Sequence, residues 1–456
     1  MTSNLQSIFT SALFTLLFCL LLATPLMAQD SDNSGTVDFT DFLLFVEAFG
    51  QSNATDTRPN ILLIIADDVG LDAMPGYDFG ENKPTMPILD GLAAQGITYD
   101  NLWSAPLCSP TRATILTGRY GFRKGVLSVD NQISESETSL HTHIRENAGY
   151  ADAILGNWHL SGARADADDP NKLGVTHCAG YLSGSLQDYW DWPLTVNGST
   201  NDSNLYATTV FTYLAIDWIS QQSSPWFLWL ARTAPHTPFY LPPDRLHARI
   251  HLIGTESDIE ARPRAYYFAA MEAMDAEIGR LLQGVDLETT LVIFIGDNGT
   301  PGQVVQSPVE RMRAKGSIYE GGIHVPMIIA GAGVTRSGER DSLLINTADL
   351  YATIADVAGT GTTNIHDSIS FRSTFTAAVS GTRTFAYSEI GSDDTVDWAI
   401  RNERYKLIGK DTGMRELYDL STDPFEAVEL ITSGLDTDAT SAQTELEALV
   451  TQLKSE

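Results

Sequence analysis

The chain is poor in cysteine and in positive charge. Its 456 residues include three cysteines, and 28 Lys and Arg stand against 58 Asp and Glu, which gives a formal net charge of -30. So few cysteines exclude a disulfide framework, and the negative charge argues against a nucleic-acid or acidic-lipid binder, because a polyanion would be repelled. With 43% hydrophobic residues, the chain is still apolar enough to fold around a large core.

Long apolar runs are scarce. The run at 12–22 precedes Pro25 and Ala28, a pattern typical of a secretory signal (residues 1–28) that is cleaved after Ala28. No Lys or Arg precedes the run, so an uncleaved membrane anchor is the alternative. No later segment approaches the ~20 apolar residues that cross a bilayer. We therefore expect an exported protein, periplasmic or extracellular, that meets a membrane only if the signal stays attached.

Removal of this signal would also remove Cys19 and leave Cys108 and Cys178. The two remaining cysteines either form one bridge or stay buried thiols. For Cys178 we expect the buried thiol.

Residues 29–56 begin with an acidic segment that has the spacing of an EF-hand loop. The sequence DSDNSGTVDFTD at 30–41 places oxygen-bearing side chains at loop positions 1, 3, 5, 9 and 12, and Gly35 at position 6. It resembles one dockerin-like half-repeat, although position 12 is Asp rather than Glu; the alternative is an acidic linker. The predicted calcium ligands are Asp30, Asp32, Ser34, Thr36, Asp38 and Asp41.

From residue 60 onward, continuous apolar runs alternate with helical patterns. ILLII at 61–65, WFLWL at 226–230, LVIFI at 291–295 and PMII at 326–329 indicate strands buried on both faces, and residues 264–282 have helical periodicity. We expect an α/β fold with a large mixed, mostly parallel sheet covered by helices on both faces. Strand patterns at 398–401, 405–408 and 416–420 and a helical pattern at 440–454 predict a smaller C-terminal α+β subdomain with an antiparallel sheet.

Two polar clusters directly follow predicted strands. Asp67 and Asp68 come after the first, and Asp297 and Asn298 after another. Each cluster alone would be read as a turn or a helix cap. However, the carboxyl ends of parallel strands meet at one edge of a sheet, and an all-oxygen set suits Ca²⁺ or Mg²⁺.

Residues 107–119 have the signals of a short helix. We expect Ser109 as its N-cap, Pro110 at its first position and Gly118 at its end. Cys108 would then lie at the helix N-terminus, where the backbone N–H groups favour an anion. Arg112, one turn on, can direct its guanidinium at the same place.

The motif CSPTR at 108–112, followed by LTGR at 116–119, resembles the signature of type I sulfatases, in the alkaline phosphatase-like superfamily. The segments GNWHL at 156–160, APHTP at 234–238, AKGSIYEGG at 314–322 and ELYDL at 416–420 resemble further blocks of that family in the same order. The likeness spans residues 60–430, and it places a catalytic domain at 57–382 and the subdomain at 383–456.

The resemblance implies an arylsulfatase-like enzyme that hydrolyses a sulfate ester, with a sulfated carbohydrate as the expected substrate. A formylglycine-generating enzyme would convert Cys108 to formylglycine, whose hydrate attacks sulfur. The implied ligands of the cation, Ca²⁺ or Mg²⁺, are Asp67, Asp68, Asp297, Asn298 and the modified Cys108. Arg112 would brace the hydrate, His159 would contact it, and His236 and Lys315 would bind the sulfate and help to protonate the leaving oxygen.

One position departs from the family. Asn157 stands where the family has lysine, so a cation that touches the sulfate is absent or is replaced by another, such as Lys124 or Arg164. The alternative functions are a phosphodiester or phosphonate monoester hydrolase of the same superfamily and a non-catalytic relative that binds sulfated glycans. Trp190 and Trp192 either stack on a sugar or pack in the core, and we expect packing.

Overall fold

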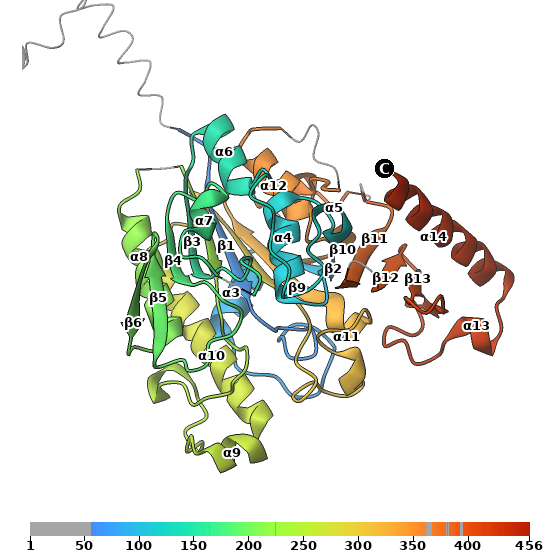
Figure 1. Cartoon of the computed structure of the whole chain (residues 1–456), viewed down its shortest axis with the longest axis horizontal. Helices are drawn as coiled ribbons and strands as arrows, with labels where there is room; N and C mark the ends of the chain where they lie inside the picture. The colour runs from blue at the N-terminus through green and yellow to red at the C-terminus, as the bar shows by residue number, and fades with distance from the viewer. Residues whose placement is uncertain are drawn as a thin grey trace, which may run out of the picture. The chain divides into compact units, whose positions relative to one another are not determined.

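A ten-stranded mixed sheet forms the centre of the structure, a computed structural model (Figure 1). Its strand order is β10-β2-β9-β8-β1-β7-β3-β4-β5-β6. β1 runs parallel to β7 and β8, whereas β9 runs antiparallel to β2 and β8. The strands are β1 (Asn60–Ala66), β2 (Ile97–Trp103), β3 (Ala151–Asn157), β4 (Cys178–Tyr181), β5 (Trp192–Val196), β6 (Ser199–Ser203), β7 (Trp226–Ala231), β8 (Thr290–Gly296), β9 (His324–Gly331) and β10 (Glu339–Asn346).

The structure describes residues 56–456 except 164, 224, 362–366, 380, 382 and 393–394. The predicted signal and calcium loop, with Asp30, Asp32, Ser34, Thr36, Asp38 and Asp41, lie outside the described residues. Within the described ranges, no helix has both the length and the apolar character needed to cross a membrane.

Helices cover both faces of the central sheet. Along β1, Leu62 and Ile64 pack with α3, α8 and α10, while Ile61 and Leu63 pack with α4, α6 and α12. Both sets of side chains are fully buried, which explains why the strand sequences are continuously apolar. The helices are α3 (Pro87–Gln95), α4 (Cys108–Thr117), α5 (Gly121–Lys124), α6 (Leu140–Ala148), α7 (Asp169–Lys172), α8 (Ala207–Ser220), α9 (Glu256–Ala261), α10 (Pro263–Leu282), α11 (Glu320–Ile323), α12 (Asp349–Val357), α13 (Leu430–Ser433) and α14 (Thr437–Ser455).

A second sheet, of four antiparallel strands in the order β11-β12-β13-β14, follows near the C-terminus. Its strands are β11 (Ala386–Ser392), β12 (Thr395–Arg401), β13 (Tyr405–Gly409) and β14 (Arg415–Asp419). Leu446 and Val450 of α14 pack on one face, and the other face meets Trp103 and Ile323 of the larger sheet and α11. The predicted fold class is confirmed, while the domain boundary at 382/383 stays a prediction.

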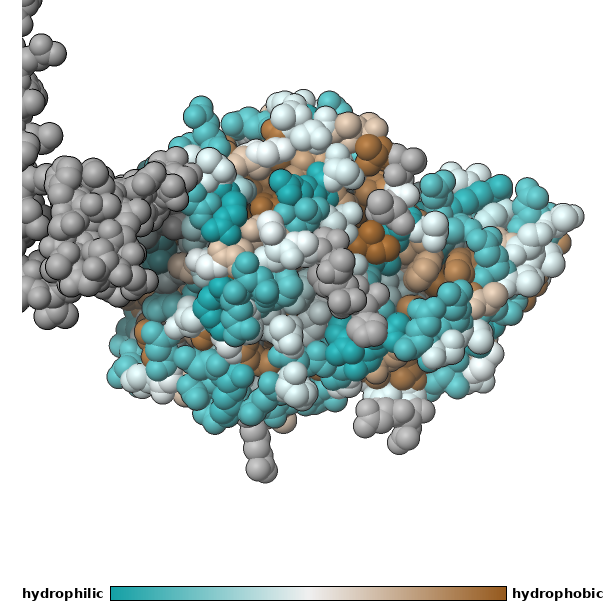
Figure 2. Space-filling model, turned by 90° about the horizontal axis from the view of Figure 1, so that it is seen from above, coloured by the Kyte–Doolittle hydropathy of each residue, from teal (hydrophilic) through white to brown (hydrophobic). Residues whose placement is uncertain are grey.

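The polar character of the chain lies mainly on its surface. Figure 2 shows a face on which hydrophilic and intermediate residues predominate and hydrophobic ones occur in scattered patches. This distribution fits a strongly charged chain whose apolar runs are enclosed by the two sheets and their helices.

Helix α4 begins two residues earlier than its capping signals predict. Its N-cap is Leu107, whose carbonyl accepts the first helical hydrogen bond, from the Thr111 N–H at 3.2 Å. The prediction of Ser109 as N-cap is therefore wrong, and its buried hydroxyl has no hydrogen-bond partner among the described residues. Gly118 closes the helix at a φ of 68°, as expected.

Lys124 of α5 braces the C-terminal half of α4. Its ammonium, on a residue that is 7% exposed, donates to the Thr114 hydroxyl at 2.7 Å and to the Arg119 carbonyl at 2.5 Å. Burial lowers the pKa of Lys124 to about 7, although Glu389 and Asp367 oppose the change. Much of its protonation is therefore lost above neutral pH.

We expect the wild type to gain stability relative to Lys124→Met as the pH rises from 7 to 10. Between the folded-state pKa of about 7 and the ordinary 10.5, the unfolded state binds a proton that the folded state lacks, so raising the pH favours folding. Urea unfolding at several pH values measures the difference. The partly exposed Lys172 offers a control, Lys172→Met. A wild-type advantage that does not grow with pH would show that the ammonium is not desolvated.

Candidate active site

The two polar clusters meet at the carboxyl edge of the large sheet. β1 and β8 are adjacent and parallel, with Ala66 in register with Gly296, so the residues that follow each strand are neighbours. The Asp68 N–H donates to Asp297 Oδ1 at 3.1 Å, and Asn298 Nδ2 donates to Asp68 Oδ1 at 2.8 Å. The side chains of Asp67, Asp68, Asp297 and Asn298 are all buried.

Arg112 forms hydrogen bonds with residues at the ends of three strands. Its Nη2 lies 3.0 Å from Asp67 Oδ2 and 3.0 Å from Asp297 Oδ2, and its Nη1 donates to the Asn157 carbonyl at the end of β3. The guanidinium is completely buried. The predicted orientation toward the helix N-terminus stays a prediction, since the guanidinium hydrogen bonds of the described residues go to the strand ends.

Cys108 is the first residue of α4 and is 1% exposed. Its Sγ and one oxygen each of Asp67 and Asp297 lie within 4.8 Å of one another. Burial, with a smaller effect of Asp67, raises the pKa of the thiol, which is therefore protonated at neutral pH. Cys108 and Cys178 are both free and buried, so the alternative of a bridge between them is wrong and the expected thiol at Cys178 is confirmed.

The side chains of Lys315 and His236 approach Asp68 from separate loops. Lys315 Nζ forms an ion pair with Asp68 Oδ1, and His236 Nε2 lies 3.7 Å from Asp68 Oδ2. Burial alone would raise the pKa of Asp68, but His236 and Lys315 outweigh it and the pKa is lowered. The His236 Nδ1–H donates to the Thr237 carbonyl at 2.7 Å, which leaves Nε2 facing the site.

His159 enters the site from the loop after β3. It is 9% exposed and has a φ of 53°, a left-handed conformation that costs of order 1–3 kcal/mol for a residue other than glycine. Burial lowers its pKa to about 3, and Arg112, His236 and Lys315 act in the same direction. The ring is therefore neutral at neutral pH, and its Nδ1 has no hydrogen-bond partner in the described part of the chain.

Asn157 is fully buried beside these groups. Its Nδ2 donates to Asp67 Oδ2 at 3.2 Å and to the Gly184 carbonyl at 2.8 Å. Lys124, one proposed substitute for the missing cation, is bonded to α4 instead, and Arg164, the other, lies outside the described residues.

The donor set fits a divalent cation. Asp67 Oδ1 and Asn298 Oδ1 are buried and have no hydrogen-bond partner within the described ranges. Burial raises the pKa of Asp67 and of Asp297 to about 7, and repulsion from neighbouring carboxylates acts in the same direction. Arg112 and Lys315 therefore do not fully compensate the negative charge of the cluster. Hard oxygen ligands suit Ca²⁺ or Mg²⁺, whereas the soft sulfur of Cys108 does not. An oxygen at position 108, as in formylglycine, would match the set.

Sequence reasoning missed two tyrosines that position the site. The Tyr267 hydroxyl, from α10, donates to the Asp68 carbonyl at 2.7 Å. The Tyr189 hydroxyl donates to the Thr233 and His236 carbonyls at 3.0 and 2.9 Å. A lone tyrosine in a helix or loop carries no pattern that distinguishes it from an ordinary core residue.

The two tryptophans of the 163–203 region differ. Trp192 is 2% exposed and its Nε1 donates to the Leu205 carbonyl, so the expected packing is confirmed for this residue. Trp190 is 42% exposed and lies against Tyr206, with ring centroids 5.2 Å apart. The expectation of core packing is therefore wrong for Trp190.

Comparison with known sequences identifies relatives along most of the chain. The Sulfatase family profile matches residues 59–360, and that of the N-sulphoglucosamine sulphohydrolase C-terminal region matches residues 311–456. N-acetylgalactosamine-6-sulfatase of Mus musculus is 30% identical over 363 residues, 70% of this chain and 66% of the relative. The human protein is 29% identical over 66% of this chain and 62% of its own length. The chain thus spans less than two thirds of these relatives.

An arylsulfatase of Klebsiella aerogenes is 26% identical over 68% of this chain and 89% of the relative. Among solved structures, Ps i-CgsB superposes with a TM-score of 0.74 and 24% identity, over 86% of this chain and 92% of that one. BT4656 superposes with a TM-score of 0.70 and 21% identity, over 88% of this chain and 99% of that one. These structures share the fold, and the profile match over residues 59–360 shows that the chain belongs to the Sulfatase family.

Proposed function

We propose that the protein hydrolyses sulfate esters of carbohydrates, with formylglycine at position 108 and a divalent cation held by Asp67, Asp68, Asp297 and Asn298. The observation that carries this proposal is the position of Cys108. It is the first residue of α4 and lies near an oxygen set with unsatisfied acceptors, which the Lys315 ammonium and the His236 imidazole approach from the Asp68 side. A nucleophile placed there has negative ligands on one side and groups that attract an anionic ester on the other.

A formylglycine at position 108 would supply, as its hydrate, one hydroxyl as the nucleophile and a second hydroxyl whose deprotonation would allow sulfate to leave. A cation held by Asp67, Asp68, Asp297 and Asn298 would supply positive charge beside position 108. Arg112 holds the carboxylates of Asp67 and Asp297 in place.

Lys315 and His236 bind the sulfuryl oxygens from the Asp68 side and help to protonate the leaving oxygen. His159, neutral at neutral pH, contributes a hydrogen bond rather than a charge.

The relatives support a sulfated carbohydrate as the substrate class. The human and mouse relatives described above are N-acetylgalactosamine-6-sulfatases. Ps i-CgsB was solved with k-i-k-neocarrahexaose and BT4656 with its substrate D-glucosamine-2-N,6-O-disulfate. Export through the signal at 1–28, maturation by a formylglycine-generating enzyme and calcium binding at 30–41 belong to the same proposal, since they suit an enzyme that acts on extracellular polymers.

We expect protein co-expressed with a formylglycine-generating enzyme to hydrolyse an aryl sulfate. Cys108→Ala should lower kcat by at least ~10³-fold, because the covalent step is lost. Release of the phenol measures the rate, and peptide mass confirms conversion of Cys108. A matched aryl phosphodiester is the comparison substrate: preference for the diester would assign the protein to phosphoryl transfer, and inactivity on both despite conversion would favour a binding protein.

We expect Ca²⁺ at one hundred times its Kd to stabilise the protein by about 2.7 kcal/mol, and EDTA to reverse the gain. Thermal unfolding followed by calorimetry measures the shift. Asn298→Ala should abolish most of it, because one oxygen ligand is removed from the buried set. Asp38→Ala, in the predicted N-terminal loop, is the control and should retain most of it. An unchanged shift in Asn298→Ala would place the cation elsewhere.

We expect Asn157→Lys to raise kcat/KM for an aryl sulfate by about tenfold or more, because one added donor to transition-state charge contributes a few kcal/mol. The substitution should also lower Tm, since Asn157 is fully buried and bonded to Asp67. Asn157→Met, of similar length without charge, separates the effect of the cation from that of size. A gain in neither variant would mean that the site does not use a cation at this position.

A further inference from the structure

The segment that carries Lys315 joins the two halves of the site. It runs from the 3₁₀ helix η2 (Arg311–Arg313) to α11. The Lys315 N–H donates to the Thr300 carbonyl, in the loop after β8, at 3.1 Å. The next N–H, of Gly316, donates to the Pro106 carbonyl, just before α4, at 3.0 Å. The position of the Lys315 ammonium therefore depends on how this short segment is held at its ends.

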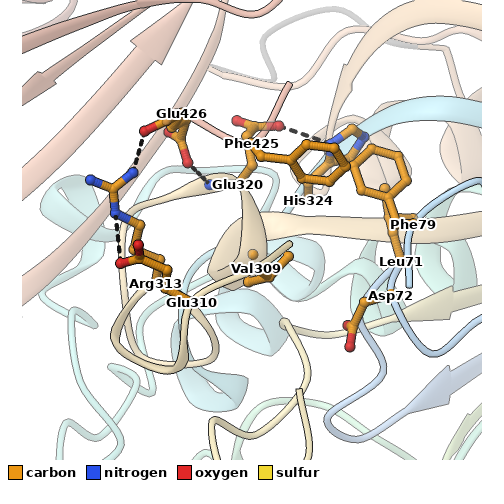
Figure 3. A pocket seen from close by; sticks show the side chains of 11 residues that line it. Leu71, Asp72, Phe79, Val309, Glu310, Arg313, Glu320, His324, Phe425 and Glu426 are labelled. Carbon is orange, nitrogen blue, oxygen red and sulfur yellow. Dashed lines mark hydrogen bonds and ion pairs between the residues drawn. The ribbon is translucent and has the colours of Figure 1, made fainter. Parts of the chain in front are cut away.

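Glu426, which follows the second sheet in the chain, contacts both ends of the segment (Figure 3). Its carbonyl accepts a hydrogen bond from Arg313 Nη1, two residues before Lys315. Its Oε2 accepts a hydrogen bond from the Glu320 N–H, at the start of α11, at 2.7 Å. One residue thus fixes the chain on either side of the lysine.

A buried charge cluster holds Glu426 in this position. Lys406 Nζ, from β13, lies 2.7 Å from Glu426 Oε1 and 3.0 Å from Glu320 Oε1, and its side chain is completely buried. His324 Nδ1 lies 2.8 Å from Glu320 Oε2. Buried ion pairs of this kind are a poor source of net stability, because desolvation offsets the attraction, but they fix geometry.

The backbone at Glu426 is also constrained. Its φ of 58° lies in the left-handed region, which costs of order 1–3 kcal/mol for a non-glycine residue. This conformation allows the carbonyl and the carboxylate of one residue to bind opposite ends of the Lys315 segment.

The far end of α11 contacts Gly299, the residue that follows Asn298. The Gly299 N–H, next to Asn298, donates to the Gly322 carbonyl at 2.9 Å. A Cβ at Gly299 would lie 1.8 Å from the Gly321 carbonyl oxygen, so the two turns are in direct backbone contact. A shift of α11 would therefore move both Lys315 and the turn that carries Asn298.

We propose that Glu426 is a positioning residue for Lys315, by which the C-terminal part of the chain sets the place of the lysine in the site. The inference rests on the proposed function to the extent that Lys315 acts on the sulfate ester. A displacement of about 1 Å can cost up to about 10²-fold in rate, so loss of the Glu426 contacts acts on chemistry as well as on folding.

The test compares Glu426→Gln, Lys315→Ala and the double variant on two sulfate esters, an aryl sulfate with a good leaving group and an alkyl sulfate with a poor one. Lys315 helps to place a proton on the leaving oxygen, so its displacement should reduce turnover of the alkyl ester about tenfold more than that of the aryl ester. The double variant should be no slower than Lys315→Ala, because the two residues act through one interaction. Equal loss on both esters, or additive losses, would overturn the proposal.

Hydrogen exchange gives a readout that needs no substrate. Peptides covering 313–323 should exchange faster in Glu426→Gln than in wild type, because the Lys315 and Gly316 amide hydrogen bonds open more often. Arg313→Met, at a partly exposed position, should have the same effect if Glu426→Gln folds poorly. Unchanged exchange in both variants would overturn the proposal.

Glu389→Gln is the matched control. Glu389 is a buried carboxylate of β11 that accepts from the Phe122 N–H and the Tyr387 hydroxyl, and in the described part of the chain it forms no hydrogen bond or ion pair with residues 311–323. It should lower Tm without changing the ratio of the two ester rates or the exchange of 313–323. Absence of turnover by the wild type would reject the proposed function, and the exchange experiment would still decide whether Glu426 holds the segment.

Discussion

The buried guanidinium of Arg112 is the interaction on which the site depends. It bonds Asp67 and Asp297 at 3.0 Å each and reaches the Asn157 carbonyl, so the ends of three strands and the start of α4 share one cation. Removing one partner of a buried ion pair typically costs 3–5 kcal/mol, because a charge is left uncompensated. Cys108, four residues earlier on the same helix, takes its place from this arrangement.

The central constraint of the site is excess negative charge in a dry environment. Three carboxylates are packed at one sheet edge, and burial raises the pKa of Asp67 and Asp297 to about 7. Arg112 and Lys315 compensate part of this charge, and unsatisfied oxygens of Asp67 and Asn298 remain. A divalent cation would satisfy both needs at once, which is why the cation and the nucleophile belong to one proposal.

The C-terminal part of the chain contacts the segment that carries Lys315. Among its described residues, the strands and the segment at Glu426 form no hydrogen bond or ion pair with the carboxylate cluster, but Lys406 and Glu426 bind the segment between Arg313 and Glu320. The second sheet is thus connected to Lys315 through hydrogen bonds and ion pairs. This connection gives a physical reason for the smaller sheet to be packed against α11.

Sequence alone determined the fold class and the placement of Asp67 and Asp297, because continuous apolar strands and the residues that follow them are local patterns. The CSPTR motif likewise predicted Cys108 and Arg112 as site residues from the sequence alone. Only the tertiary structure decided that the N–H groups of Arg112 donate to residues at the strand ends, and that Glu426 contacts the Lys315 segment. These contacts join residues 45 to 185 positions apart around Arg112, and 106 and 113 apart at Glu426. No local pattern encodes such pairs, since chain folding brings them together.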